Sequence, residues 1–256
     1  MSTTTRPLFP ARPASRQGPV LRTAISLLAW FGQVGLWYWA IVLVVVVGLP
    51  FLIGAFGEVG TSVLWFARQS GVWFPFSVLI GVATAYPQVH VASGMTRRSY
   101  VRGALLAAAG LAAAFALLMA GGLVLERAWY GAMGWDWSPQ DQGWFDPDVT
   151  FGSLLVAYLA TFLVAYVSGL LVGTVYAAAG GWWGTLTLPL TAGPSLVMTI
   201  LVGNSNDWVP FSELFGGDGG STPLALVLTV AAVLTLAMAT AFWLIATRRS
   251  IAPRRG

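Results

Sequence analysis

Six apolar runs divide this chain, and each is about as long as a helix needs to be to cross a lipid bilayer, roughly 20 residues. The runs cover residues 36–56, 72–92, 103–125, 150–175, 184–203 and 223–246. Hydrophobic residues make up 57% of the sequence and charged residues only 9%, which is far outside the range of soluble globular domains. The sequence therefore predicts an all-α polytopic membrane protein with six transmembrane helices.

The segments before and after these runs carry basic residues. Residues 1–19 combine arginine with Pro, Ser and Thr, which predicts a disordered basic cytoplasmic tail, and residues 247–256 predict a second basic cytoplasmic tail. Between them, one transmembrane domain is expected over 20–246. Within 20–33, apolar residues recur at helical spacing with Arg22 on another side, which predicts an amphipathic interfacial helix. A first span that simply begins early is the alternative.

The charged residues are segregated by loop, and this segregation predicts the orientation of the chain. One side has arginines without any acid among them: Arg6, Arg12, Arg16, Arg22, Arg97, Arg98, Arg102, Arg248, Arg249, Arg254 and Arg255. The other side holds all nine acids, together with Arg68 and Arg127. Because basic residues accumulate in cytoplasmic loops, we expect a multi-pass protein of the cell membrane with both termini in the cytoplasm. An even number of spans satisfies this placement.

Two residue types are absent and a third is rare, and this limits the chemistry. All 13 basic residues are arginine, so the chain has no lysine for a P-loop and is not expected to hydrolyse ATP itself. The lack of cysteine and the single histidine argue against thiol nucleophiles, disulfides, cysteine-ligated metal sites and bis-histidine haem. We therefore expect no catalytic, cofactor-binding or metal site, and the segregated charge gives no reason to expect nucleic acid as a partner.

The predicted spans contain no acid or arginine at depth. Ion-coupled carriers usually place an ionisable group near the bilayer midplane, so a self-powered secondary transporter is disfavoured. His90 lies near the inner end of the second span, where an interfacial hydrogen-bonding role is favoured over a proton relay. Ser93 and Gly94 beside this histidine match the motif of an intramembrane serine protease poorly, so that enzyme class is discounted.

The fifth run carries hydroxyl side chains four residues apart, which places them on one face of a helix. They are Thr187, Thr191, Ser195 and Thr199. The helix is predicted to bend or break at Pro189, Gly193 and Pro194. One interpretation of the hydroxyl face is the polar wall of a substrate path. The other is that the hydroxyls bond carbonyls of their own helix or pack on a neighbouring one.

Small residues and aromatic residues form two further patterns. The fourth run has a stripe of small residues, Ala165, Gly169, Gly173 and Ala177, which predicts close packing on another helix, in this chain or in a second copy. The predicted outer loop 126–150 interleaves tryptophans with aspartates, which predicts an aromatic belt at the level of the lipid headgroups. A calcium site or a ligand lid in this loop is the alternative.

A basic decapeptide, residues 94–103, separates the second and third runs. The chain enters it through the sequence Ser93-Gly94-Met95-Thr96-Arg97-Arg98. This pattern, together with six spans, cytoplasmic termini and a basic amphipathic entry segment, resembles the permease subunit of ABC-2 type ABC transporters. The resemblance covers most of the chain, but only this turn is motif-like. The chain departs from the family pattern between the fourth and fifth runs, where residues 176–184 contain no arginine.

The resemblance implies partners and a function. Thr96, Arg97, Arg98 and Arg102 would face a separate ATP-binding subunit, and 20–33 would be the entry helix of the family. The chain would form a homodimer or heterodimer of permease subunits surrounded by membrane lipids. The expected function is therefore the membrane-spanning subunit of an ATP-driven exporter, energised through the inner loop 94–103. The alternative is a membrane scaffold or assembly factor without transport, in which the arginines only orient the helices.

Overall fold

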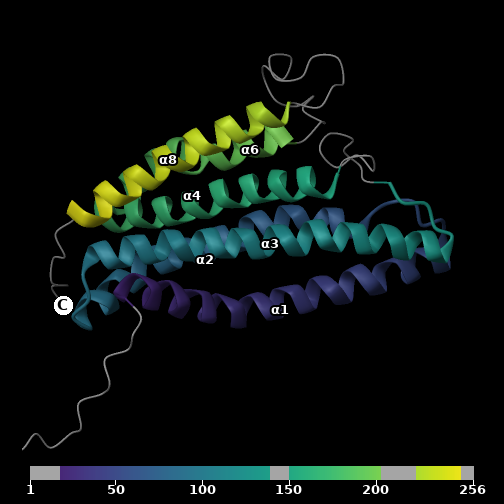
Figure 1. The fold of residues 1–256 in the computed structure, drawn as a ribbon, viewed down its shortest axis with the longest axis horizontal. Coiled ribbons are helices and arrows are strands. Elements are labelled where there is room, and N and C mark those ends of the chain that lie inside the picture. Colours follow the sequence, from purple (N-terminus) through teal and green to yellow (C-terminus); the bar gives the residue numbers. More distant parts are fainter. Residues whose placement is uncertain (1–17, 139–149, 203–222, 249–256) are drawn as a thin grey trace, which may run out of the picture.

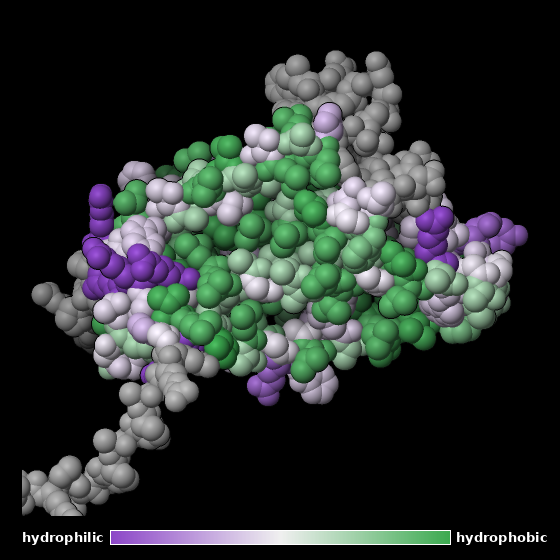
Figure 2. All heavy atoms as spheres, viewed as in Figure 1, coloured by the Kyte–Doolittle hydropathy of each residue, from purple (hydrophilic) through white to green (hydrophobic). Residues whose placement is uncertain are grey.

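A computed structural model describes residues 18–138, 150–202 and 223–248, and every regular element in this part of the chain is a helix (Figure 1). Five helices are long and apolar enough to cross a membrane: α1 (Pro19–Phe56), α2 (Val63–Ala92), α3 (Arg97–Met133), α4 (Phe151–Leu186) and α8 (Leu224–Arg248). On the face seen in Figure 2, apolar side chains cover the middle of the molecule and polar ones gather at its two ends. The predicted class, an all-helical membrane protein, is confirmed at this level.

Three described helix ends lie together at one end of the molecule (Figure 1). The start of α1 contacts the start of α3, because the carbonyl oxygen of Val20 lies 3.0 Å from where a Cβ on Gly103 would be. The end of α8 is there too, since Arg97 and Arg248 line the same cavity. We call this the arginine end. The predicted tails, apart from residues 18–19 and 247–248, lie outside the described residues, as does 139–149 of the predicted outer loop.

Residues 20–33 form the first part of one continuous helix, α1, so the predicted separate interfacial helix is not confirmed. Pro19 stands at its first position, where a missing N–H costs nothing, and no break interrupts the chain before Phe56. Its 38 residues make it about 57 Å long, almost twice the roughly 30 Å of bilayer hydrocarbon. The bounds therefore match the alternative of a first helix that begins early.

Helix α1 is most fully buried over its first third, and Tyr38 and Trp39 farther along also pack against the core. Its side chains Thr23, Leu27 and Phe31 are buried, whereas just 6% of its most apolar stretch is buried. Gly103 in α3 permits this contact, because a Cβ there would lie 2.6 Å from Cβ of Thr23. The face that packs against α3 includes Thr23, and it overlaps only in part with the apolar face that suggested an amphipathic helix, because Leu21 and Ile25 are exposed.

Helix α4 lies in the centre of the bundle and packs against α2 with almost no space between the backbones. In its most apolar stretch 78% of the residues are buried. A Cβ on Gly169 would lie 2.5 Å from the carbonyl oxygen of Phe76, and one on Gly173 would collide with the carbonyl oxygen of Ile80. The small-residue stripe therefore packs on a helix of this same chain, which confirms one of the two partners that the sequence left open.

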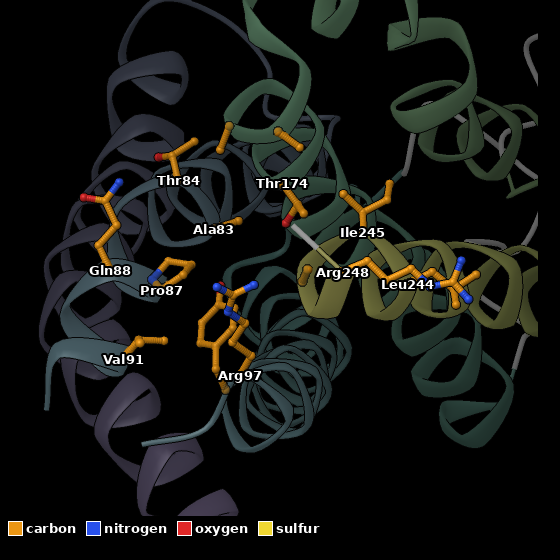
Figure 3. A pocket seen from close by; sticks show the side chains of 14 residues that line it. Ala83, Thr84, Pro87, Gln88, Val91, Arg97, Thr174, Leu244, Ile245 and Arg248 are labelled. Carbon is orange, nitrogen blue, oxygen red and sulfur yellow. The ribbon is translucent and has the colours of Figure 1, made fainter. Parts of the chain in front are cut away.

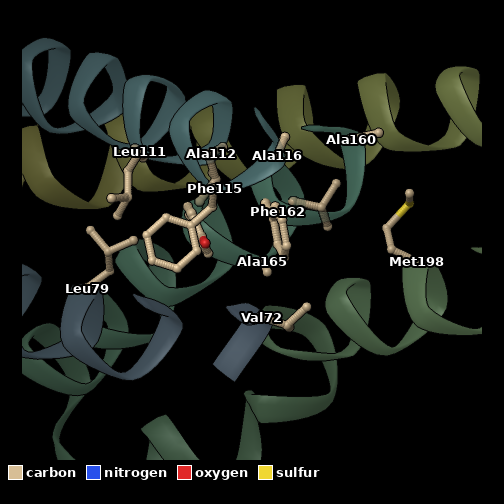
Figure 4. Close-up of a cluster of buried hydrophobic side chains, with 14 of the residues drawn as sticks. Val72, Leu79, Leu111, Ala112, Phe115, Ala116, Ala160, Phe162, Ala165 and Met198 are labelled. Atoms are coloured by element: carbon tan, nitrogen blue, oxygen red, sulfur yellow. The ribbon is translucent and has the colours of Figure 1, made fainter. Parts of the chain in front are cut away.

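Aromatic and aliphatic side chains from α2, α3 and α4 fill the core (Figure 4). The ring of Phe115 from α3 contacts two rings of α4 edge to face, at 6.2 Å from Phe162 and 5.9 Å from Tyr166 between centroids. Leu79 of α2 is buried in the same cluster. Edge-to-face packing of this kind adds to the area buried and fixes the relative rotation of the helices.

The chain reverses direction at Gly180, near the end of α4. Gly180 has φ 83° and ψ 176°, a backbone conformation that residues with a Cβ rarely adopt. Beyond it the chain runs back along α4: Tyr176 and Thr185 share a hydrogen bond of 2.9 Å between their hydroxyls, and the hydroxyl of Ser168 donates to the carbonyl of Thr191. These two pairs place the returning segment antiparallel to α4.

The returning segment 181–202 is broken into short pieces, as its prolines and glycine predicted. After the end of α4 come α5 (Leu188–Thr191) and α6 (Gly193–Val202), with Pro189 near the start of α5. The predicted fifth run is therefore not a single helix of spanning length. The helix before the reversal continues past residue 175, the end predicted for the fourth run, as far as Gly180, and residues 181–186 belong to the returning segment although the bounds of α4 include them.

Candidate functional site at the arginine end

The connection between α2 and α3 is a tight capped turn, shorter than the loop 94–103 that the sequence predicted. Gly94 adopts φ 80°, and α3 already begins at Arg97. The hydroxyl of Thr96 accepts a hydrogen bond of 3.2 Å from the backbone N–H of Ser99, which caps the first turn of α3. Because Thr96 caps the helix and arginine favours the helical conformation, α3 can begin directly at Arg97. The predicted docking residues from 97 onward therefore lie on a helix.

His90 fastens the end of α2 to the start of α3. Its side chain is buried, and Nε2 lies 3.1 Å from the hydroxyl of Ser99. Its carbonyl accepts hydrogen bonds from the hydroxyl of Ser93 at 2.8 Å and from the N–H of Met95 at 3.3 Å. Ser93 thus bonds the backbone of His90 rather than its ring, which is not the arrangement of a nucleophile and its base. The histidine has the hydrogen-bonding environment that the sequence favoured.

The four predicted docking residues have different surroundings. Thr96 is used as the helix cap, so its hydroxyl has a structural role. Arg98 and Arg102 are exposed, and the guanidinium of Arg102 lies 5.3 Å above the ring of Trp243 in α8. Arg97 is half-buried and lines a cavity. The structure therefore leaves Arg98 and Arg102 as the surface cations of this cluster.

That cavity lies between α2, α3, α4 and α8 and has a volume of about 720 Å³ (Figure 3). Its polar lining includes Arg97, Tyr100 and Arg248, and its apolar lining includes Leu244 and Ile245. In Figure 3, Arg97 reaches from α3 toward the middle of the lining side chains. The sequence pointed to Arg97 but not to its grouping with Arg248, because 151 positions separate them and only the packing of α8 brings them together.

The predicted substrate-path residues share one inward-facing side of the broken segment, and most of their hydroxyls are already bonded. Thr187 donates to the carbonyl of Trp183 at 3.0 Å, and Thr191 and Thr199 likewise donate to carbonyls one turn back. Ser195 differs, since its hydroxyl is buried with no hydrogen-bond partner among the described residues. The three threonines thus fit the interpretation in which the hydroxyls bond carbonyls of their own helix. Ser195, whose hydroxyl is without a partner among the described residues, fits the interpretation of a polar wall.

At the opposite end, the carboxylate of Glu126 in α3 caps the N-terminus of α2. It accepts hydrogen bonds from the N–H groups of Val63 at 3.0 Å and Leu64 at 2.9 Å, from the indole of Trp137 at 3.1 Å, and from the hydroxyl of Ser62. Glu126 is only 3% exposed. The charge pattern of the sequence placed Glu126 among the outer acids and gave it no structural role. The signal that this pattern missed is Ser62, a typical helix-capping residue just before an apolar run.

Helix α2 begins well before the predicted second run and therefore contains a buried cation. Arg68 is 9% exposed, and its guanidinium lies 5.0 Å from the centre of the Trp65 ring. Arg68 and Glu126 lie just outside the predicted second and third runs, 72–92 and 103–125, so they do not contradict the expectation that the predicted spans carry no acid or arginine at depth. Both residues lie within the terminal turns of long helices, where the helix continues beyond the apolar run.

Comparison of the chain with protein-family models, with curated proteins and with solved structures yields no match. A functional proposal for this chain therefore rests on the geometry of the arginine end. That end combines a rigid capped turn, two exposed arginines on the first turns of α3 and a cavity lined by two further arginines.

Proposed function

We propose that the chain is the membrane-spanning permease subunit of an ATP-driven ABC-2 type exporter and that a separate ATP-binding subunit docks at the arginine end. The observation that carries the proposal is the pair Arg98 and Arg102, exposed on the first turns of a helix whose start is held by Thr96 and His90. A rigid basic surface suits an acidic partner, because complementary charge steers association and fixes its register.

The proposed topology has six crossings, with the broken segment 181–202 as the fifth. In its support, the reversal at Gly180 and the pairing of Ser168 with Thr191 give this segment a direction opposite to that of α4. A further support is that the described chain starts and finishes at the arginine end, as an even number of crossings would place it (Figure 1). We place this end in the cytoplasm, together with both termini, on the positive-inside rule.

The packing offers a route by which force at the turn would reach the centre of the bundle. His90 and Ser99 connect α2 with α3 directly behind the arginines. Helix α2 in turn has almost no freedom against α4, because backbone atoms of Phe76 meet Gly169. A displacement of the turn by a docked ATPase would therefore move α2, α3 and α4 as connected elements. The energy comes from the partner, since this chain has no lysine with which to build a P-loop.

For the substrate path we propose the inward face of the broken segment, which holds Thr187, Thr191, Ser195 and Thr199. Helix breaks at membrane depth free backbone groups for a ligand, and they are tolerated where they are packed in protein or line a cavity. Thr187 and Thr191 line a second cavity of about 370 Å³ between α4 and α8. Ser195 contributes a hydroxyl with hydrogen-bonding capacity to spare. Transport in this scheme is shared between two permease copies.

Copurification tests the proposed docking. The full chain is isolated from its native membrane with and without Arg102→Glu, and captured proteins are assayed for ATP binding. We expect an ATP-binding-cassette subunit with the wild type and its loss with the variant. Arg127→Glu is the matched control, because Arg127 is also an exposed arginine of α3, stacked 5.7 Å from a tryptophan ring, but at the other end.

Two results of this experiment contradict the permease proposal. If no ATP-binding protein accompanies the wild type, a scaffold or assembly factor without transport becomes the better reading. If Arg102→Glu and Arg127→Glu lose the partner equally, the loss reflects general destabilisation rather than docking at the arginine end.

A further inference from the structure

The cavity at the arginine end has a polar part and an apolar part, and the two suit different portions of one ligand. We propose that it binds a membrane phospholipid with an anionic headgroup, whose phosphate lies near Arg97 and the hydroxyl of Tyr100, with Arg248 farther out on α8, and whose acyl chain leaves along α4 and α8. Its volume of about 720 Å³ is within the range of cavities that hold organic ligands. The proposal requires only that this end lies at a membrane surface, so it does not rest on the permease function.

The polar part of the cavity is built to receive an anion. Arg97 of α3 and Arg248 of α8 both contribute to the lining. In Figure 3 the guanidinium of Arg97 lies among the lining side chains, whereas that of Arg248 lies farther out along α8. Tyr100 lines the cavity as well, and its hydroxyl has no hydrogen-bond partner among the described residues although the side chain is 2% exposed. A buried hydroxyl without a partner is rare in proteins, and here a phosphate oxygen would supply the acceptor.

The apolar part favours a lipid over a soluble anion. Small side chains on α4, Ala177 and Ala178, line it together with Leu244 and Ile245 of α8. In Figure 3, Ile245 and Leu244 lie on one side of Arg97 and Pro87 of α2 on the other. A free phosphate would leave this apolar surface uncovered, whereas an acyl chain would cover it and gain the hydrophobic contribution of burial. Basic pockets between helices at a membrane surface are suited to anionic headgroups in general.

The test measures lipid binding to the purified full chain in detergent by native mass spectrometry. Phosphatidylglycerol and phosphatidylcholine with identical acyl chains are titrated separately, and the bound fraction gives an apparent Kd for each. We expect the wild type to bind phosphatidylglycerol more tightly. The double variant Arg97→Gln/Arg248→Gln should weaken that binding roughly tenfold and leave phosphatidylcholine binding nearly unchanged.

A matched double variant separates the cavity from the general basic surface. Arg98→Gln/Arg102→Gln removes the same charge from exposed arginines that do not line the cavity, so we expect less than a twofold change. A third variant, Ala177→Phe, fills the apolar part without changing charge and should also weaken phosphatidylglycerol binding. Each variant is first checked for a monodisperse elution profile. If the cavity double variant fails this check, Arg97→Gln alone replaces it, and if the control double variant fails, Arg102→Gln alone replaces that.

Three outcomes overturn the proposal. Equal affinity of the wild type for the two lipids removes the selectivity for an anionic headgroup. Equal losses in the two double variants assign the binding to surface charge in general. Displacement of the lipid by inorganic phosphate at a similar concentration assigns the cavity to a soluble anion. Because no ATP-binding subunit is present in the assay, its result is independent of the copurification experiment.

Discussion

The hydroxyl of Tyr166 in α4 donates a hydrogen bond of 2.9 Å to the carbonyl oxygen of Gly71 in α2, four residues before Pro75. In a regular helix the N–H of residue 75 would bond this carbonyl, but proline has no N–H. Tyr166 therefore supplies, from another helix, the donor that Pro75 removes. The bond joins residues 95 positions apart and ties the centre of α4 to α2.

Tyr166→Phe leaves the Gly71 carbonyl buried without a donor, so we expect a loss of stability of about 1–2 kcal/mol. Thermal unfolding in detergent, followed by circular dichroism, gives the change. Pro75→Ala provides the internal control because it restores an N–H to the helix. In the Tyr166→Phe background, Pro75→Ala should recover part of the lost stability. Strictly additive losses in the double variant would show that the tyrosine does not compensate for the proline.

Because α2 and α4 approach each other closely at Gly169, a larger residue there should destabilise the protein. In Gly169→Ala the new methyl group would meet the backbone at Phe76, which cannot move aside as a flexible side chain would. We expect a loss of about 1–3 kcal/mol in the same unfolding assay. Gly81→Ala is the matched control, since Gly81 is also helical and nothing lies within 4 Å of its added Cβ. It should be neutral or slightly stabilising, because alanine favours helix. Similar losses in both variants would argue against a close helix contact.

The buried cap at Glu126 gives a third expectation. Glu126→Ala leaves the N–H groups of Val63 and Leu64 without their acceptor, and we expect a loss of about 2–3 kcal/mol. Glu126→Gln should cost less, since its amide oxygen can still accept from these two groups. Glu58→Ala, at an exposed acid close in sequence to the capped turn, should change the free energy of unfolding by less than about 0.5 kcal/mol. Hydrogen exchange at the first turn of α2 locates the effect, and unchanged exchange there would contradict the capping role.

Local patterns in the sequence predict the helices well because a bilayer-length apolar run has few other structures available. They also predict the break in 184–203, since Pro189 and Gly193 act on their own backbone whatever surrounds them. The stripe at Gly169 and Gly173 correctly indicated a close helix contact. Each of these features is encoded within a few consecutive residues.

The features that the sequence did not predict all depend on residues far apart in the chain. Glu126 caps a helix that begins more than 60 positions earlier, and neither partner indicates the other. The runs predicted for α2 and α3 are shorter than the observed helices. Hydropathy indicates where the chain leaves the lipid, whereas hydrogen bonding and caps determine where a helix ends. Arg248 lines the cavity at the arginine end because of how α8 packs, and nothing near Arg248 in the sequence indicates this packing.

Cysteine labelling can test the proposed topology, and the absence of native cysteine makes every introduced one informative. In intact cells, a membrane-impermeant maleimide should label Arg127→Cys but not Arg98→Cys, because the arginine end is expected to face the cytoplasm. Ser205→Cys tests the broken segment: it should label from outside if residues 181–202 cross the membrane and stay protected if they do not. Permeabilised cells provide the control, since all three positions should then react. Labelling of Arg98→Cys in intact cells would reverse the orientation and move the proposed ATPase docking surface to a compartment without ATP.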